Sequence, residues 1–304
     1  MTQLQSPNLT HNGARPSGLI VPADESAARV LSALEQSRLK DARSIDAVPN
    51  SGWENARAWV FYLKGMFALE RREFASAESR FMRSIIWIQT EKTIERQESS
   101  PDTHRLMARA LHQMGCLYRR QDRPADAARF HLAAYRLRDD HGSYDEMWES
   151  ALNLGIDHDL ASGHDDARRW YDDAISLGTR ASHQADHKQA IVWARLSGLL
   201  ASTGDYAQAV DAARKACDSW HAHDTGSLAT ARADLDVGYS LLKWGESLHG
   251  KENRRAEDIL TEARNRLCAS YEALLAFGPS ADEDVRWCDE QRDFAERLLA
   301  SLES

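Results

Sequence analysis

Two short patterns of histidine and cysteine are the parts of this sequence best placed to carry out chemistry. His183 and His187 stand four residues apart with Asp186 beside them, a spacing that can hold a divalent metal on one helix face. Cys217 and His221, also four apart, could form a thiol–imidazole pair. However, no third ligand is in register with the histidines, and no carboxamide is placed to orient the imidazole. We therefore expect a solvated helix start at the first pattern and an inward-packed cysteine at the second.

The wider sequence holds no other catalytic constellation. It has no G-x-S-x-G, no glycine-rich phosphate loop and no H-E-x-x-H, and its carboxylates are spread along its length. The four cysteines form no C-x-x-C, and the first three fall within helical patterns, where a cysteine is usually a small buried hydrophobe: Cys116, Cys217, Cys268 and Cys288. We expect no catalytic residue, no cofactor and no metal, and predict that the protein is not an enzyme.

The elements that would position these residues are paired helices, seen most clearly between Ala190 and Cys217. Trp193, Leu196 and Leu200 recur at helical spacing and predict one buried stripe, with Trp193 in the core. Gly204 and Asp205 interrupt this pattern, and a second stripe follows that is rich in alanine. Two short amphipathic helices joined by a tight turn form a helical hairpin, which cannot bury its apolar face alone.

Copies of this hairpin occur along most of the chain. A glycine on the first helix precedes an alanine on the second by twelve residues in three copies, at Gly65/Ala77, Gly115/Ala127 and Gly155/Ala167. The equivalent positions in all five copies are Gly65, Gly115, Gly155, Ser197 and Gly238, which are 50, 40, 42 and 41 residues apart.

The layout resembles a tetratricopeptide repeat (TPR), with an aromatic residue, a leucine, a Gly-Asp-Tyr turn and then spaced alanines. Periods near 40 residues resemble the repeats of kinesin light chains and of bacterial peptide-sensing regulators. HEAT and armadillo arrays share this period, but the Gly-to-Ala offset and the Gly-Asp-Tyr turn fit TPR units better. The resemblance implies an all-α, right-handed α-solenoid of about five TPR-like hairpins.

The chain is accordingly divided into four parts. We predict a disordered tail over residues 1–22, a leading helix and linker over 23–53, a repeat array over 54–277 and a C-terminal capping helix over 278–304. The net charge of −9 disfavours wholesale binding to nucleic acid or to an anionic membrane. No signal peptide or membrane-spanning run is evident, so we expect a cytoplasmic protein.

The family resemblance places the first helix of each hairpin on the concave side, where a partner would bind. In copies three and five this predicts that Leu152 and Leu235 also line the groove. Copy two carries a positive stripe that could hold an acidic peptide, a terminal carboxylate or a phosphate, next to apolar anchors in copy one. Alternatively, Arg109 and Arg119 pair with Glu149 and Asp159 of the next repeat. The predicted partner-binding residues are Trp59, Tyr62, Met66, Arg105, Arg109, His112, Arg119 and Tyr239.

These patterns favour a non-catalytic, protein- or peptide-binding scaffold or regulatory subunit that acts on a separately encoded partner. The alternative is a ligand-responsive sensor that closes around a small molecule or a short signalling peptide. An enclosed pocket with polar groups would favour the sensor, whereas an open trough would favour the scaffold. The sequence leaves the partner and the oligomeric state open.

Overall fold

The computed structural model describes residues 56–95, 101–181, 185–223 and 226–302. Within these ranges every regular element is a helix and no strand occurs, so the chain is all-α as predicted. The predicted tail (1–22) and leading helix (23–53) lie outside the described residues. No helix in the described ranges is long and apolar enough to cross a membrane.

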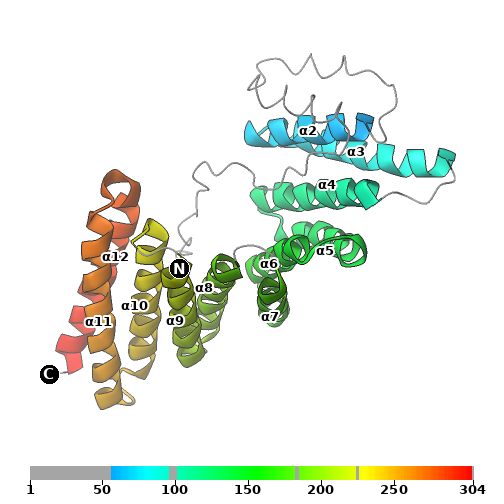
Figure 1. Ribbon diagram of the computed structural model, residues 1–304. Helices are drawn as coiled ribbons and strands as arrows, with labels where there is room; N and C mark the ends of the chain where they lie inside the picture. Colours follow the sequence, from blue (N-terminus) through cyan, green and yellow to red (C-terminus); the bar gives the residue numbers. More distant parts are fainter. Residues whose placement is uncertain (1–55, 96–100, 182–184, 224–225, 303–304) are drawn as a thin grey trace. The chain divides into compact units, whose positions relative to one another are not determined.

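The helices form successive antiparallel pairs, and within each of the two units described below each helix packs on its neighbours in the sequence (Figure 1). The chain contacts divide into two compact units, one ending at His141 and the other beginning at Gly142. The first unit holds α2 (Ala56–Glu70), α3 (Phe74–Glu95), α4 (Pro101–Arg120) and α5 (Pro124–His141). The second holds α6 (Tyr144–Leu160), α7 (His164–Arg180), α8 (Ala185–Thr203), α9 (Tyr206–His223), α10 (Leu228–Leu248), α11 (Asn253–Leu275) and α12 (Asp282–Leu302).

The turns between paired helices share one backbone device. Two residues before the second helix of the first four pairs, the chain adopts a positive φ, at Arg72 (59°), Asp122 (59°), Ser162 (61°) and Gly204 (90°). This left-handed conformation ends the first helix and lets the second return along it. Glycine adopts it freely, whereas the three other residues do so at a cost. The predicted break at Gly204 and Asp205 is therefore the turn between α8 and α9.

The glycines of the first helices make room for a large side chain from the second helix. A Cβ atom built on Gly65 would lie 2.6 Å from the ring of Phe81, and one on Gly155 would lie 2.5 Å from the ring of Tyr171. Both rings are fully buried. Because a methyl group would not fit there, the glycine fixes how closely the two helices approach. We call the buried position sixteen residues after the glycine the ring position.

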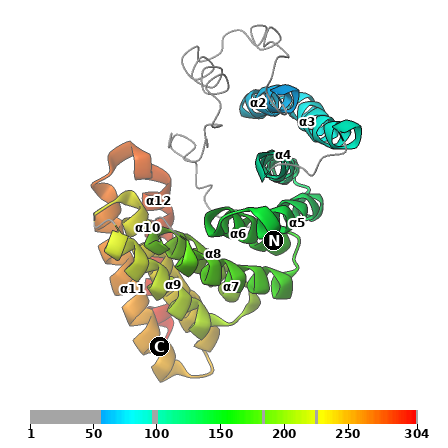
Figure 2. The same cartoon turned by 45° about the vertical axis from the view of Figure 1, so that its right-hand side comes forward.

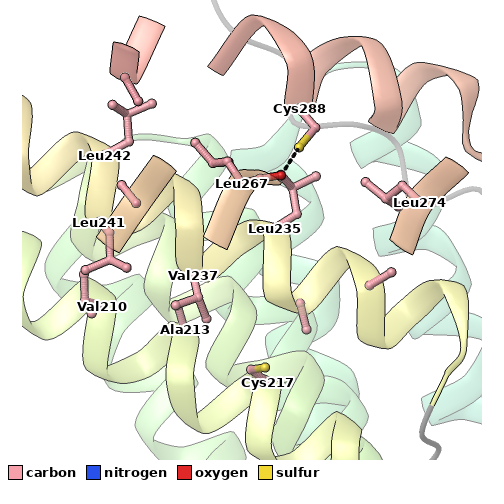
Figure 3. Packing of buried hydrophobic residues seen from close by; sticks show 14 of the residues in the cluster. Val210, Ala213, Cys217, Leu235, Val237, Leu241, Leu242, Leu267, Leu274 and Cys288 are labelled. Carbon is pink, nitrogen blue, oxygen red and sulfur yellow. Dashed lines mark hydrogen bonds between the residues drawn. The ribbon is translucent and has the colours of Figure 1, made fainter. Parts of the chain in front are cut away.

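The C-terminal end of the second unit has the largest of the described apolar cores. Figures 1 and 2 show α8, α9, α10 and α11 side by side, and α12 packs on α10 and α11. Leu235 and Leu267 lie between these helices, and the buried thiol of Cys288 donates to the carbonyl of Leu267 at 3.2 Å (Figure 3). A short 3₁₀ helix, Gly278–Ala281, leads into α12 at the predicted break. The last helix thus covers the apolar face that α10 and α11 leave open.

Candidate functional site

The apolar residues predicted to anchor a partner lie on α2, in the first unit. Trp59, Tyr62 and Met66 are each partly exposed and pack against the core that α2 shares with α3 and α4. The centroid of the Tyr62 ring lies 5.7 Å from that of Trp59 and 6.0 Å from that of the buried Phe81. One side of this row therefore belongs to the core, and the other side reaches solvent.

The predicted positive stripe lies on the neighbouring helix α4. Arg105, Arg109 and Arg119 are partly exposed. The guanidinium carbon of Arg109 lies 6.0 Å from the centroid of the Trp59 ring, which is within cation–π range. The structure thus brings Arg109 of the predicted stripe next to Trp59 of the aromatic row. We call the partly exposed side chains of Trp59, Tyr62, Met66, Arg105 and Arg109 the α2–α4 face.

The other predicted residues do not all join this face. Tyr239 lies on α10 in the second unit, where its ring centroid is 4.9 Å from that of Trp287 on α12. Leu152 and Leu235, expected in the groove, are instead buried, with 8% and 3% of their surfaces accessible. Glu149 and Asp159 belong to the second unit, so their pairing with Arg109 and Arg119 stays a prediction.

His112 is also not part of the exposed stripe. It is buried, with 5% of its surface accessible, and its Nε2 atom lies 3.7 Å from the sulfur of Cys116. The Nε2 atom of His131 on α5 lies at the same distance, 3.7 Å, from that sulfur. The three ligand-type atoms lie within 4.8 Å of one another. Two imidazoles and a thiol therefore converge in the hairpin of α4 and α5.

His131 reaches this cluster because it occupies the ring position of the second hairpin. A Cβ atom on Gly115 would lie 2.5 Å from its Nε2 atom, just as the equivalent glycines contact Phe81 and Tyr171. The imidazole is fully buried. A polar ring thus stands in the core where the first and third hairpins have a phenyl and a phenol.

The electrostatic surroundings of Cys116 favour its thiolate. Burial raises the pKa of the thiol, but the positive charge and hydrogen bond of His112 oppose it, and so do those of His131. Together the two imidazoles hold the pKa of Cys116 well below its usual range. The Nη2 atom of Arg119 lies 3.9 Å from the same sulfur and adds a further positive charge.

In the second unit, charged side chains from α8, α10 and α12 interact with one another. Arg232 on α10 donates from Nε and Nη2 to Oδ2 of Asp284 on α12, at 2.9 and 2.7 Å. Asp284 is buried, with 5% of its surface accessible. The exposed carboxylate of Asp236 lies within electrostatic reach of Arg195, Arg232 and Asp284. We call these four residues the α8–α12 charge cluster.

The pair predicted from Cys217 and His221 is joined by a third residue, Asp234 of the next hairpin. Its carboxylate accepts from the Cys217 thiol at 3.2 Å and lies 3.1 Å from Nε2 of His221 and 3.5 Å from Nη1 of Arg266. Cys217 packs inward as predicted. Burial and the Asp234 carboxylate raise its pKa to about 12, so the sulfur keeps its proton at neutral pH.

The remaining histidine pattern gives no cluster in the described residues. His183 lies outside them. The ring centroid of His187 lies 4.8 Å from that of Trp220, with the two rings almost perpendicular. This imidazole therefore packs edge-on against an aromatic ring of α9.

Comparison with known proteins shows similarity in structure only. No family model matches the sequence, and no curated protein matches it. BtubC from P. vanneervenii aligns with 92% of this chain and 90% of its own, at 17% identity and a TM-score of 0.51. Aspartyl phosphate phosphatase F from Bacillus subtilis aligns with 90% and 70%, at 10% identity and a TM-score of 0.57. A signal-transduction ATPase from Pyrococcus horikoshii with a tetratricopeptide repeat sensor aligns with 91% and 43%, at 10% identity and a TM-score of 0.60.

These similarities, together with the helix pairs, define the chain as an α-helical repeat protein. A structure of nearly identical TPR-like repeats from a putative kinesin light chain of Podosopora anserina aligns with 72% of this chain and 99% of its own (9% identity, TM-score 0.51). The fold is therefore that of tetratricopeptide-like helical repeats, as the glycine-to-alanine spacing predicted.

Proposed function

We propose that this protein is a non-catalytic TPR scaffold or regulatory subunit that binds a separate protein or peptide. The observation that supports this most directly is the α2–α4 face, where Arg109 stacks on Trp59 and both remain partly exposed. Aromatic residues and arginine are the side chains that most often dominate binding energy at protein interfaces. The buried side of the row holds these residues in place, so little conformational entropy is lost when a partner binds.

The charge of this face indicates the chemistry of the partner. Arg105 and Arg109 lie one turn apart on α4 and can each form charge-assisted hydrogen bonds with a carboxylate. The protein as a whole is acidic, with a net charge of −9, so an acidic peptide would be attracted to this face and repelled elsewhere. An acidic segment with an apolar residue is therefore the partner that this face would select.

A peptide-display selection on the full chain tests this function. We expect enriched peptides to contain Asp or Glu near an apolar residue. Arg105→Glu/Arg109→Glu should weaken their binding by roughly 100-fold or more, because two charge-assisted bonds are lost and each is worth about 1.5–3 kcal/mol. The matched control is Arg129→Glu on α5, whose side chain is 81% exposed and pairs only locally with Asp126. Equal weakening in the control, or none in the double variant, would rule out this face.

The α8–α12 charge cluster favours the second candidate, a ligand-responsive sensor. Its two arginines and two aspartates, one of them buried, could receive a small ligand that carries both charges. The TPR segment of the Pyrococcus protein is described as a sensor, which supports this alternative. A thermal-shift panel of metabolites and short peptides distinguishes the two, since a ligand at 100 times its Kd stabilises the fold by about 2.7 kcal/mol.

A further inference from the structure

We propose that His112, Cys116 and His131 form a site for a thiophilic transition metal, with Zn²⁺ as the ion that fits best. The site lies within the single hairpin of α4 and α5 and does not depend on the proposed partner. The sequence alone led us to expect no metal in this protein.

The distances match those of a zinc centre. Zinc binds sulfur at about 2.3 Å and imidazole nitrogen at about 2.0–2.1 Å, so tetrahedral geometry separates the two ligand atoms by roughly 3.5–3.6 Å. Both sulfur-to-nitrogen distances are 3.7 Å. Both sulfur-to-nitrogen separations are thus within about 0.2 Å of the values that a tetrahedral zinc ion requires, and the three ligand atoms lie within 4.8 Å of one another.

The chemistry of the three groups also suits a metal. Both histidines present the same atom, Nε2, to the sulfur of Cys116, and a neutral imidazole coordinates through this lone pair. The thiol loses its proton to solvent as the sulfur–metal bond forms. With three protein ligands, the fourth position of a tetrahedral ion stays open to water or to a group of a bound partner.

The ring position provides an independent argument. His131 occupies a buried place that Phe81 and Tyr171 fill with rings in the neighbouring hairpins. A buried polar ring is costly unless it is bonded, and it contributes less apolar burial than phenylalanine. Coordination of a metal together with Cys116 would offset the cost of an imidazole at this position.

The second cysteine–histidine group lacks these properties and serves as an internal comparison. Cys217 and His221 are each hydrogen-bonded to the Asp234 carboxylate, at 3.2 and 3.1 Å respectively. Asp234 is also paired with Arg266. This group is a hydrogen-bonded network, and we do not assign a metal to it.

The test measures metal binding by the full chain, purified under reducing conditions and stripped with a chelator. After addition of Zn²⁺ and gel filtration, we expect about one zinc per chain. Co²⁺ should give the absorption of a tetrahedral ion and a sulfur-to-cobalt charge-transfer band. Cys116→Ser and His131→Phe should each abolish both signals, whereas the matched control Cys217→Ser should keep them. Circular dichroism checks that the variants remain folded, and His131→Phe introduces the ring that Phe81 already provides beside Gly65.

Three results would overturn the proposal. The native chain could retain no stoichiometric zinc, or zinc and the cobalt spectrum could persist in Cys116→Ser. Alternatively, Cys116 could be labelled rapidly by a thiol reagent whether or not Zn²⁺ is present. That last result would identify a reactive thiolate, stabilised by the two imidazoles and Arg119, instead of a metal ligand.

Discussion

The pair between Arg232 and Asp284 offers the sharpest test of how α12 is held on the second unit. The Asp284 side chain is 5% exposed, and its Oδ2 atom accepts both hydrogen bonds from one guanidinium. Arg232→Met keeps most of the side-chain length but removes the charge and both donors. The variant therefore leaves a carboxylate that is buried without its partner.

The expected loss follows from the burial of the two groups. Removing one member of a buried ion pair typically costs about 3–5 kcal/mol. The Arg232 side chain is 34% exposed, so water can reach the vacated space and solvate part of the charge. We therefore expect the free energy of unfolding to fall by about 2–3 kcal/mol. Arg232→Met/Asp284→Leu should recover most of this loss, because no unpaired charge is left behind.

Urea unfolding followed by tryptophan fluorescence measures these values, and hydrogen exchange should show α12 opening first. Arg286→Met is the control, since Arg286 is exposed on α12, the helix of Asp284, and donates only to a backbone carbonyl. Its free energy of unfolding should change by less than about 0.5 kcal/mol. This reasoning would be refuted if Arg232→Met lowered the free energy of unfolding by less than about 1 kcal/mol. It would also be refuted if the loss in the double variant equalled the sum of the losses in Arg232→Met and Asp284→Leu.

Three further predictions concern the turns, the helix contacts and pH. Gly198 lies in helix α8 with open space around its Cβ position, so Gly198→Ala should stabilise by about 0.5–1 kcal/mol. Gly204→Ala, at a φ of 90°, should destabilise by about 1–2 kcal/mol. Thermal unfolding measures both alanine variants, and a change in stability of the same sign in both would contradict the assigned turn. Gly155→Ala should destabilise by about 1–3 kcal/mol in urea, because its Cβ would lie 2.5 Å from the buried ring of Tyr171. Burial and a hydrogen bond to a carboxylate raise the pKa of Tyr118 to about 12, so its phenol stays protonated in the folded state after an ordinary tyrosine has ionised. The unfolding free energy should therefore be unaffected below about pH 10 and fall between pH 10 and about 12, by at most about 2.7 kcal/mol, and Tyr118→Phe should remove this fall.

The repeat fold could be predicted from the sequence because each hairpin repeats the same steric solution. Gly65 and Gly155 mark the places where a large ring must fit, and the helical stripes indicate which faces pack. The prediction was less accurate at the edges of stripes. Trp193 was expected in the core, but it is only partly buried, and Lys215 lies 4.3 Å above its ring. A stripe gives the direction of a side chain but not how far the neighbouring helix extends over it.

The candidate sites were harder to predict because their residues come from different helices. Asp234 lies seventeen residues beyond Cys217 and in the next repeat, so no local spacing indicates that they meet. A signal for the metal site was present, since His112 and Cys116 have the same four-residue spacing as Cys217 and His221. It was overlooked because His131, the third member, occupies a position that the repeat pattern reserves for the core.

The imidazole of His131 at the ring position suggests that the hairpin of α4 and α5 is less stable without a metal than it would be with an aromatic hydrocarbon ring there. If the ring position serves only packing, phenylalanine suits it better than histidine, as Phe81 does beside Gly65. In the presence of a chelator, His131→Phe should therefore raise the free energy of unfolding by about 1–2 kcal/mol, because it buries a larger apolar ring and no polar atoms. With saturating Zn²⁺ the order should reverse, since only the native chain gains the free energy of metal binding. Urea unfolding under both conditions tests this. If the native chain were more stable than His131→Phe even with the chelator, the imidazole would stabilise the hairpin without a metal. That result would contradict the idea that histidine at this position lowers stability in order to bind a metal.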